Sequence, residues 1–120
     1  MKILIVDDSK LARMGVIKSL KEIEPSAELF QAANGLEAVA IFKAESPRVV
    51  FLDLTMPVMD GYEALKQIIA IDADAQVIVI SADIQNEAKQ RVLKAGAKNM
   101  YPKPINEEKM LQIFQQDLLI

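Results

Sequence analysis

Short runs of apolar residues recur along the chain, and several of them end at polar or charged residues. The clearest runs are Ile3–Val6, Val49–Leu52 and Val77–Ile80. An apolar run without alternation is typical of a strand that is buried on both faces, as in a parallel sheet. We predict two further short strands, at Asn99–Pro102 and at the more polar Glu28–Ala32, which we expect nearer the sheet edge.

Helix-start residues follow four of these strands. Asn34 and Asp60 are each followed three positions later by a glutamate, as in a capping box, and Ser9 and Asn106 can also cap a helix. The predicted helices run from Ser9 to about Ile23, Asn34 to about Ala44, Asp60 to about Ile71, Gln85 to a stop at Gly96, and Asn106 onward. Their expected apolar faces hold Leu11, Met14, Ile17 and Leu20 in the first helix, Leu36, Val39, Ala40 and Phe42 in the second, and Met110, Ile113, Phe114 and Leu118 in the last.

Five alternations of strand and helix predict an α/β fold, a doubly wound parallel sheet with helices on both faces. With 120 residues, we expect a single domain over residues 1–120. Right-handed crossovers bring the C-terminal ends of all the strands to one edge. Ligands of such sheets bind at that edge, where the strand order reverses. If the order is 2-1-3-4-5, the first and third strands flank that point.

Polar side chains stand at four of these strand ends: Asp7 and Asp8, Asp53, Ser81, and Lys103. Taken singly, each has an ordinary structural explanation, as a helix cap or a solvated turn residue. Together they predict a cluster in which three carboxylates repel one another until a hard divalent cation binds, Mg²⁺ first and Mn²⁺ as an alternative. Lys103 could pair with Asp53 or with a phosphate oxygen, and Ser81 could hydrogen-bond the same oxygen.

Phosphoryl transfer suits this set of residues better than acyl transfer. It needs a nucleophile, neutralisation of the phosphoryl oxygens, and positioning. A carboxylate can serve as the nucleophile and form an aspartyl phosphate, and Asp53 is the residue we expect to do so.

Composition removes several other functions. The chain has no cysteine and no histidine, which excludes disulfides, thiolate sites, Ser-His catalysis and His-ligated zinc. The net charge of −3 and the lack of a basic run argue against direct DNA binding. The first apolar run is too short for a signal peptide or a membrane span, so we expect a cytoplasmic protein without membrane insertion.

The chain resembles the receiver domain of bacterial two-component response regulators, particularly the stand-alone chemotaxis type. The matching segments span essentially the whole chain in family order: Ile5–Ser9, Asn34–Ala38, Leu52–Pro57, Met59–Gly61, Ser81–Ala82, Gly96–Ala97 and Lys103–Pro104. The resemblance implies a flavodoxin-like (βα)5 fold with strand order 2-1-3-4-5.

The resemblance also implies roles for the clustered residues. Asp53 would receive a phosphoryl group from a sensor histidine kinase or a histidine phosphotransfer protein. Magnesium would be held by Asp8, Asp53 and the main-chain carbonyl of Thr55, with Asp7 acting mostly through water. Ser81 and Lys103 would contact the phosphoryl group, and the Lys103–Pro104 peptide would be cis. The chain ends after the last predicted helix, so we expect output by altered binding to another protein, such as a flagellar motor switch or a phosphatase.

One position departs from the family. Receiver domains usually carry Tyr or Phe three residues before the lysine, and Met100 stands there instead. Either the flexible Met100 follows Ser81 on activation, or a bulge lets Tyr101 take over. Asp83 is also expected near the phosphoryl group, where it would repel hydroxide or orient water.

Other functions compete with a phosphorylation-dependent switch. The chain could act as a phosphate sink or a relay, or as a phosphorylation-independent interaction domain. A phosphatase that works through an aspartyl phosphate ranks lower, because such enzymes carry Asp-x-Asp near the first strand and Asp7-Asp8 lacks that spacing. We therefore expect a signalling protein that catalyses its own phosphorylation and dephosphorylation rather than a separate enzyme.

Overall fold

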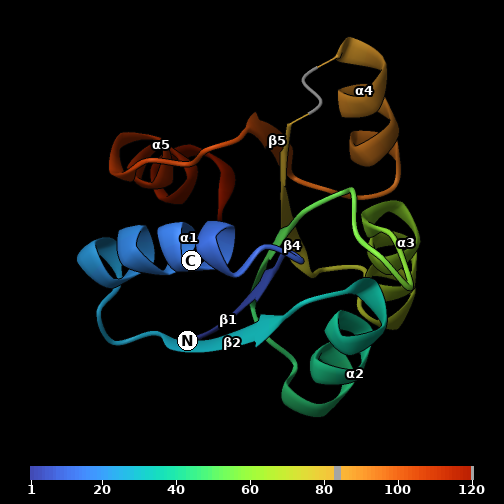
Figure 1. Ribbon diagram of the computed structural model, residues 1–120, viewed down its shortest axis with the longest axis horizontal. Helices are drawn as coiled ribbons and strands as arrows, with labels where there is room; N and C mark the ends of the chain where they lie inside the picture. Colours follow the sequence, from blue (N-terminus) through green and yellow to red (C-terminus); the bar gives the residue numbers. More distant parts are fainter. Residues whose placement is uncertain (83–84, 120) are drawn as a thin grey trace.

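The computed structural model describes residues 1–82 and 85–119, and its strands form one parallel sheet in the order β2-β1-β3-β4-β5 (Figure 1). The strands are β1 (Lys2–Val6), β2 (Glu28–Ala32), β3 (Val49–Leu52), β4 (Gln76–Ser81) and β5 (Asn99–Pro102). The helices are α1 (Lys10–Ile23), α2 (Gly35–Glu45), α3 (Gly61–Ile71), α4 (Asn86–Lys94) and α5 (Glu107–Gln112), and α5 continues as the π-helical segment η1 (Ile113–Asp117). The predicted alternation and strand order are confirmed, with β2 at an edge.

The centre of the sheet sets the position of the candidate site. Val6, the last residue of β1, pairs with Leu52, the last residue of β3. Asp7 and Asp53 therefore leave neighbouring strands at the same level. The main-chain N–H of Asp53 donates to the carbonyl of Val6 at 2.9 Å, which continues the ladder by one bond beyond the strands.

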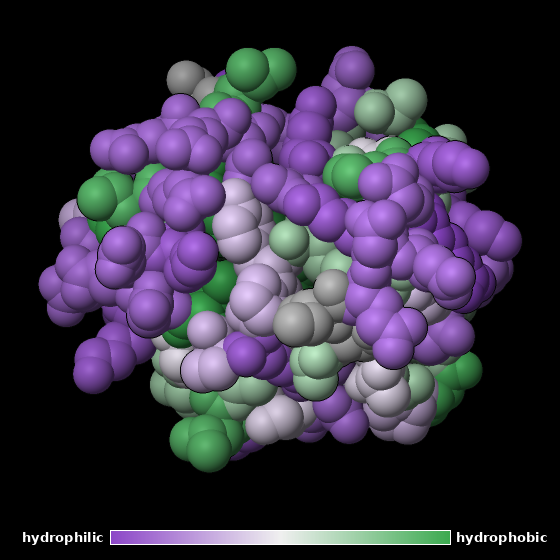
Figure 2. Space-filling view, turned by 90° about the horizontal axis from the view of Figure 1, so that it is seen from above, coloured by the Kyte–Doolittle hydropathy of each residue, from purple (hydrophilic) through white to green (hydrophobic). Residues whose placement is uncertain are grey.

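Helices cover both faces of the sheet, α1 and α5 on one and α2, α3 and α4 on the other (Figure 1). Alternate residues of each strand enter the two cores, so β1 gives Ile3 and Ile5 to one and Leu4 and Val6 to the other. Seen from above, the surface is mostly hydrophilic, with paler and apolar residues in a central band (Figure 2). Within the described residues, no helix is both long and apolar enough to cross a membrane.

The predicted caps start their helices. The side chains of Ser9, Asn34, Asp60 and Asn106 each accept a hydrogen bond from the main-chain N–H three residues later. Glu37 adds a bond at the start of α2 by accepting from the N–H of Ala33, the residue before the cap, at 3.0 Å.

The predicted apolar faces of two helices were partly wrong. Leu11 and Met14 are 85% and 44% exposed, and Leu36 and Ala40 are also exposed. The predicted Ile17, Leu20, Val39 and Phe42 are buried, and the other buried residues of these helices are Val16 and Ser19 in α1 and Gly35 and Ala38 in α2. A helix has about 3.6 residues per turn, so residues taken at steps of three drift around it and away from the buried face.

Strand β5 settles one of the alternatives at Met100 and Tyr101. It pairs regularly with β4, Val79 with Met100 and Ile80 with Tyr101, so Asn99–Pro102 contains no bulge. Met100 packs in the core beneath α2, α3 and α4, and Tyr101 packs in the opposite core. The prediction that a bulge brings Tyr101 to the position of Met100 is wrong, because the strand's alternation puts the two side chains on opposite faces.

Tyr101 instead belongs to a polar network at the C-terminal segment. Its hydroxyl donates to the carboxylate of Asp117 in η1, and the side-chain amide of Asn99 donates to the same carboxylate at 3.2 Å. Burial, and then the hydrogen bond to Asp117, raise the pKa of Tyr101 to about 12. The network ties β5 to η1.

Candidate functional site

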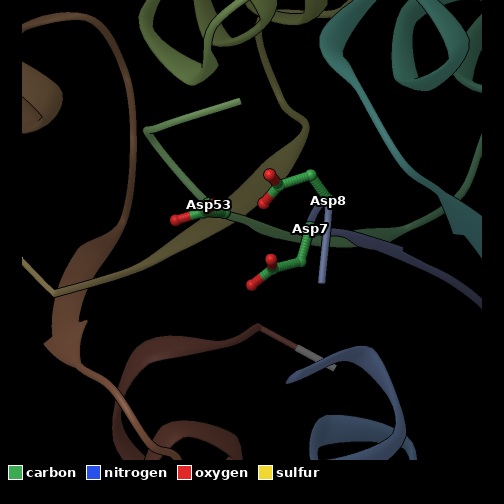
Figure 3. Close-up of side chains that lie close together, drawn as sticks. All are labelled: Asp7, Asp8 and Asp53. Atoms are coloured by element: carbon green, nitrogen blue, oxygen red, sulfur yellow. The ribbon is translucent and has the colours of Figure 1, made fainter. Parts of the chain in front are cut away.

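Three carboxylates meet at the C-terminal edge of the sheet. Asp7 and Asp8 follow β1 and Asp53 follows β3, and one carboxylate oxygen of each lies within 4.8 Å of the others (Figure 3). Asp7 and Asp53 are buried, at 6% and 5% exposure, whereas Asp8 is exposed. The convergence that the strand ends predicted is confirmed for these three residues.

Lys103 is the cation of this cluster. Its Nζ lies 2.7 Å from Oδ2 of Asp7 and 3.3 Å from Oδ1 of Asp53. Its main-chain N–H donates to the carbonyl of Ser81 at 3.0 Å, so the chain after β5 is fixed to the end of β4. The Lys103–Pro104 peptide is cis, as the family resemblance implied.

The electrostatics of the cluster favour adding a cation. Burial, and then the negative charge of Asp7, raise the pKa of Asp53 above its ordinary value, although Lys103 and the main-chain N–H of Thr55 act in the opposite direction. Burial alone would lower the pKa of Lys103, but its bonds to Asp7 and Asp53 outweigh it and raise that pKa. The site therefore holds more negative charge than one lysine neutralises.

The other predicted site residues lie along the same edge. Ser81 is buried at the end of β4, and Thr55 lies in the exposed loop that leaves Asp53. The structure does not test the roles expected for Ser81, Lys103 or the Thr55 carbonyl, which stay predictions. Asp83 lies outside the described residues.

The loop from Asp53 to α3 closes tightly on the site. Gly61 packs so closely that a Cβ there would lie 2.1 Å from the main-chain oxygen of Asp53, and its N–H donates to the carbonyl of Leu54 at 2.9 Å. Only glycine allows α3 to begin this close to the carboxylate-bearing strand end. Within the loop, Val58 has a positive φ of 68° and the N–H of Met59 donates to the carbonyl of Pro57, which together form a strained γ-turn.

A cavity of about 270 Å³ adjoins the carboxylates. Asp7, Asp53 and Lys103 line its polar end, and Val16 and Ile105 are among the apolar residues that line the rest, between α1 and the loop after β5. The buried carboxylates are thus within reach of small solutes.

The donor set fits magnesium. All three residues offer carboxylate oxygens, the ligands that this ion prefers, and the exposure of Asp8 leaves room for the several waters that Mg²⁺ usually retains. Nitrogen and sulfur ligands, which would favour zinc, are excluded by the lack of histidine and cysteine.

Comparison with known proteins identifies the family. The sequence model of the response regulator receiver domain family matches residues 3–115 of this chain. Chemotaxis protein CheY of Bacillus subtilis (strain 168) is 39% identical over 117 residues, which cover 98% of this chain and 97% of that protein. CheY of Thermotoga maritima is 39% identical over 114 residues, with 92% of each chain covered. This chain therefore belongs to the response regulator receiver domains, and these relatives are of the CheY type.

Solved structures show the same fold. A chain of the CheX-CheY-BeF3-Mg+2 complex from Borrelia burgdorferi matches with a TM-score of 0.87 and 35% identity, over 100% of this chain and 90% of that one. Vibrio cholerae chemotaxis protein CheY4 matches with a TM-score of 0.87 and 31% identity, over 98% of both chains. The flavodoxin-like fold expected from the sequence is confirmed.

Sequence reasoning missed two contributors to the site. Arg13 donates a hydrogen bond to the main-chain carbonyl of Asp7. The apolar pattern does not indicate this contact, because the helix that carries Arg13 was assigned only by its cap and its periodicity. Gly61 was assigned to a helix start and to a segment that matches the family, and neither assignment predicted its tight approach to the main chain of Asp53.

Proposed function

We propose that this receiver domain is a phosphorylation-dependent switch in which Asp53 accepts the phosphoryl group. One observation supports the proposal above all: the buried, electrostatically unfavourable Asp53 stands beside Asp7 and Asp8 and in contact with Lys103. A carboxylate in this environment destabilises the folded protein. Its use as the nucleophile of phosphoryl transfer would explain why it is there.

The transfer step uses the residues of the cluster as follows. An oxygen of Asp53 attacks the phosphorus of a phosphohistidine, the P–O bond forms, the P–N bond breaks, and the imidazole leaves with a proton from solvent. The Lys103 ammonium, already in contact with Asp53, would pair with a phosphoryl oxygen. Ser81 would donate a hydrogen bond to the phosphoryl group from the neighbouring strand end.

Bound Mg²⁺ would supply charge neutralisation at the phosphoryl oxygens. Asp8, Asp53 and the main-chain carbonyl of Thr55 would hold it, and Asp7, which is already bonded to Lys103, would act mostly through water. Lys103 would thus be shared between Asp7 and the phosphoryl group.

The output of the switch is a change in protein binding. We propose that phosphorylation shifts a pre-existing equilibrium by drawing Ser81 toward the phosphoryl group, with the buried Met100 following. The donor would be a histidine kinase or a histidine phosphotransfer protein in the cytoplasm. The Borrelia burgdorferi structure is a complex of CheY with a second protein, CheX, which supports output through binding to a protein partner; a phosphatase or a flagellar motor switch would be such a partner.

A gel that retards phosphoproteins tests the proposal. Wild-type protein incubated with phosphoramidate and Mg²⁺ should show a shifted band that is absent in Asp53→Asn and absent when Mg²⁺ is chelated. A shift that persists in Asp53→Asn would refute the assignment of Asp53. No shift in the wild type would favour a phosphorylation-independent interaction domain.

Partner binding by the labelled wild type and by a second variant separates the switch from a phosphate sink. Lys103→Ala should still be labelled on Asp53. It should gain no affinity for a partner, because the phosphoryl group no longer contacts the Lys103 ammonium. A wild-type protein that is labelled and changes affinity for no partner would act as a sink or relay.

A further inference from the structure

Arg13 of α1 bonds the main chain of the candidate metal site. Its Nη1 donates to the main-chain carbonyl of Asp7 at 2.6 Å, and its Nε donates to Oε1 of Gln31 in β2 at 3.0 Å. Neither bond reaches a carboxylate, so the contact of Arg13 with the cluster is with its backbone. The guanidinium joins the end of β1 to the edge strand.

Asp7 is held at every polar group. Its N–H donates to the carbonyl of Ala32 at 3.1 Å, and its Oδ1 accepts from the N–H of Ser9 at 2.9 Å. Its Oδ2 lies 2.7 Å from Nζ of Lys103, and its carbonyl accepts from Arg13. The position of Asp7 is therefore fixed before any metal binds.

The side chain of Asp8, by contrast, is not fixed by bonds of its own. Its side chain is exposed, and within residues 1–82 and 85–119 no hydrogen bond or ion pair holds its carboxylate. The direction of that side chain depends on the backbone that carries it. The Asp7 carbonyl belongs to the planar peptide that joins Asp7 to Asp8, so a bond that fixes this oxygen also fixes the plane from which Asp8 starts.

We infer that Arg13 is a positioning residue that orients the Asp7–Asp8 peptide so that the Asp8 carboxylate faces the Mg²⁺ site, with Gln31 bracing its guanidinium. The inference rests on the proposed function. It assigns a role in metal affinity to a residue that is neither a ligand nor a contact of the phosphoryl group.

Charge and geometry make opposite predictions for Arg13. Removing a positive charge near a cation site should strengthen Mg²⁺ binding if Arg13 acts only through its field. Removing the bond to the Asp7 carbonyl should weaken binding, because Asp8 would then have to be ordered when the metal arrives. The sign of the change in affinity therefore distinguishes the two effects.

The experiment measures the Mg²⁺ dissociation constant from the rise in the urea midpoint with Mg²⁺ concentration. Arg13→Met should bind Mg²⁺ roughly tenfold more weakly, at the lower end of the effect of residues that orient metal ligands. Arg13→Lys keeps the positive charge but loses the guanidinium that donates to both the Asp7 carbonyl and Gln31. Its Mg²⁺ dissociation constant should lie between those of Arg13→Met and wild type. Gln31→Ala should lose less, and Lys10→Met, which removes an exposed α1 cation, should leave binding unchanged or slightly tighter.

Labelling with phosphoramidate gives a second readout. The Mg²⁺ concentration for half-maximal labelling of Arg13→Met should rise by the same factor, while the rate at saturating Mg²⁺ should match the wild type. A variant that was merely less stable would lose stability in chelator without shifting this half-saturation point.

Unchanged or tighter Mg²⁺ binding in Arg13→Met would overturn the inference while leaving the proposed function intact. Failure of wild-type protein to respond to Mg²⁺ would overturn the proposed function and the inference together. If Arg13→Met does not fold, Gln31→Ala decides, because it removes only the brace from an exposed position, and an unchanged dissociation constant there would overturn the inference.

Discussion

Neutralising Asp53 should make the metal-free protein more stable. Its carboxylate is buried beside Asp7 and Asp8, with oxygens within 4.8 Å of one another, and Lys103 lies 3.3 Å away. At an effective dielectric constant of roughly 20, the repulsion from Asp7 costs about 3.5 kcal/mol and the attraction to Lys103 contributes about 5 kcal/mol, while water screens the exposed Asp8. The charges alone thus favour the ionised form by about 1.5 kcal/mol, and the raised pKa of Asp53 shows that burial of the carboxylate outweighs this attraction.

Asp53→Asn removes both the repulsion and the burial of a charge. The raised pKa of Asp53 has the same sign, since it shows that the folded protein disfavours the ionised form. Because solvent screens part of the repulsion, we expect a gain of about 1 to 2 kcal/mol in the free energy of unfolding. Asp74→Asn, which removes an exposed charge elsewhere, should change stability by less than about 0.5 kcal/mol.

Urea unfolding followed by circular dichroism measures this difference, first in chelator and then with Mg²⁺. Mg²⁺ at about 100 times its dissociation constant should stabilise the wild type by about 2.7 kcal/mol and Asp53→Asn by much less, so the order of stability should reverse. The reasoning would fail if Asp53→Asn were no more stable than wild type in chelator, or if Mg²⁺ stabilised both equally.

Further expected outcomes concern pH, packing and the C-terminal network. Because the pKa of Asp53 is raised above its ordinary value of 3.8, the folded state keeps this proton to higher pH than the unfolded state. The stability advantage of Asp53→Asn over wild type should therefore grow as the pH rises above about 4 and level off once Asp53 is ionised in the folded protein, and a constant advantage in urea melts would contradict this. Gly61→Ala should destabilise by about 1 to 3 kcal/mol, and Gly15→Ala, where a Cβ meets nothing within 4 Å, should stabilise by up to about 1 kcal/mol; equal urea midpoints would refute the packing argument. Asp117→Asn should lower the pKa of Tyr101 from about 12, as read from tyrosinate absorbance, and an unchanged titration would deny the pairing.

The sheet and the carboxylate cluster could be predicted from the sequence because both depend on local patterns. Short uninterrupted runs such as Val49–Leu52, each followed by polar residues, favour a strand buried on both faces, and parallel connections then bring every strand end to one edge. That Asp7 and Asp53 meet depends also on β1 and β3 being neighbours, and this strand order was implied by the family resemblance.

The remaining features depend on packing between elements, which one sequence does not specify. Leu11 and Ile17 are equally apolar, and only the position of α1 against the sheet and α5 determines that one is 85% and the other 5% exposed. The register of β5 against β4 determines which face of the sheet Tyr101 lies on. The approach of α1 to the end of β1 determines that Arg13 reaches the Asp7 carbonyl. Each of these requires knowing where two elements lie relative to each other.

The most direct test of the central claim is to locate the phosphoryl group. Borohydride reduces an acyl phosphate to an alcohol, so a phosphorylated aspartate becomes homoserine and can be found by peptide mass spectrometry. After incubation with phosphoramidate and Mg²⁺, we expect homoserine at position 53 and aspartate at positions 7 and 8, with no conversion when Mg²⁺ is chelated. Conversion at Asp7 or Asp8 with Asp53 unmodified, or conversion that does not depend on Mg²⁺, would contradict the account.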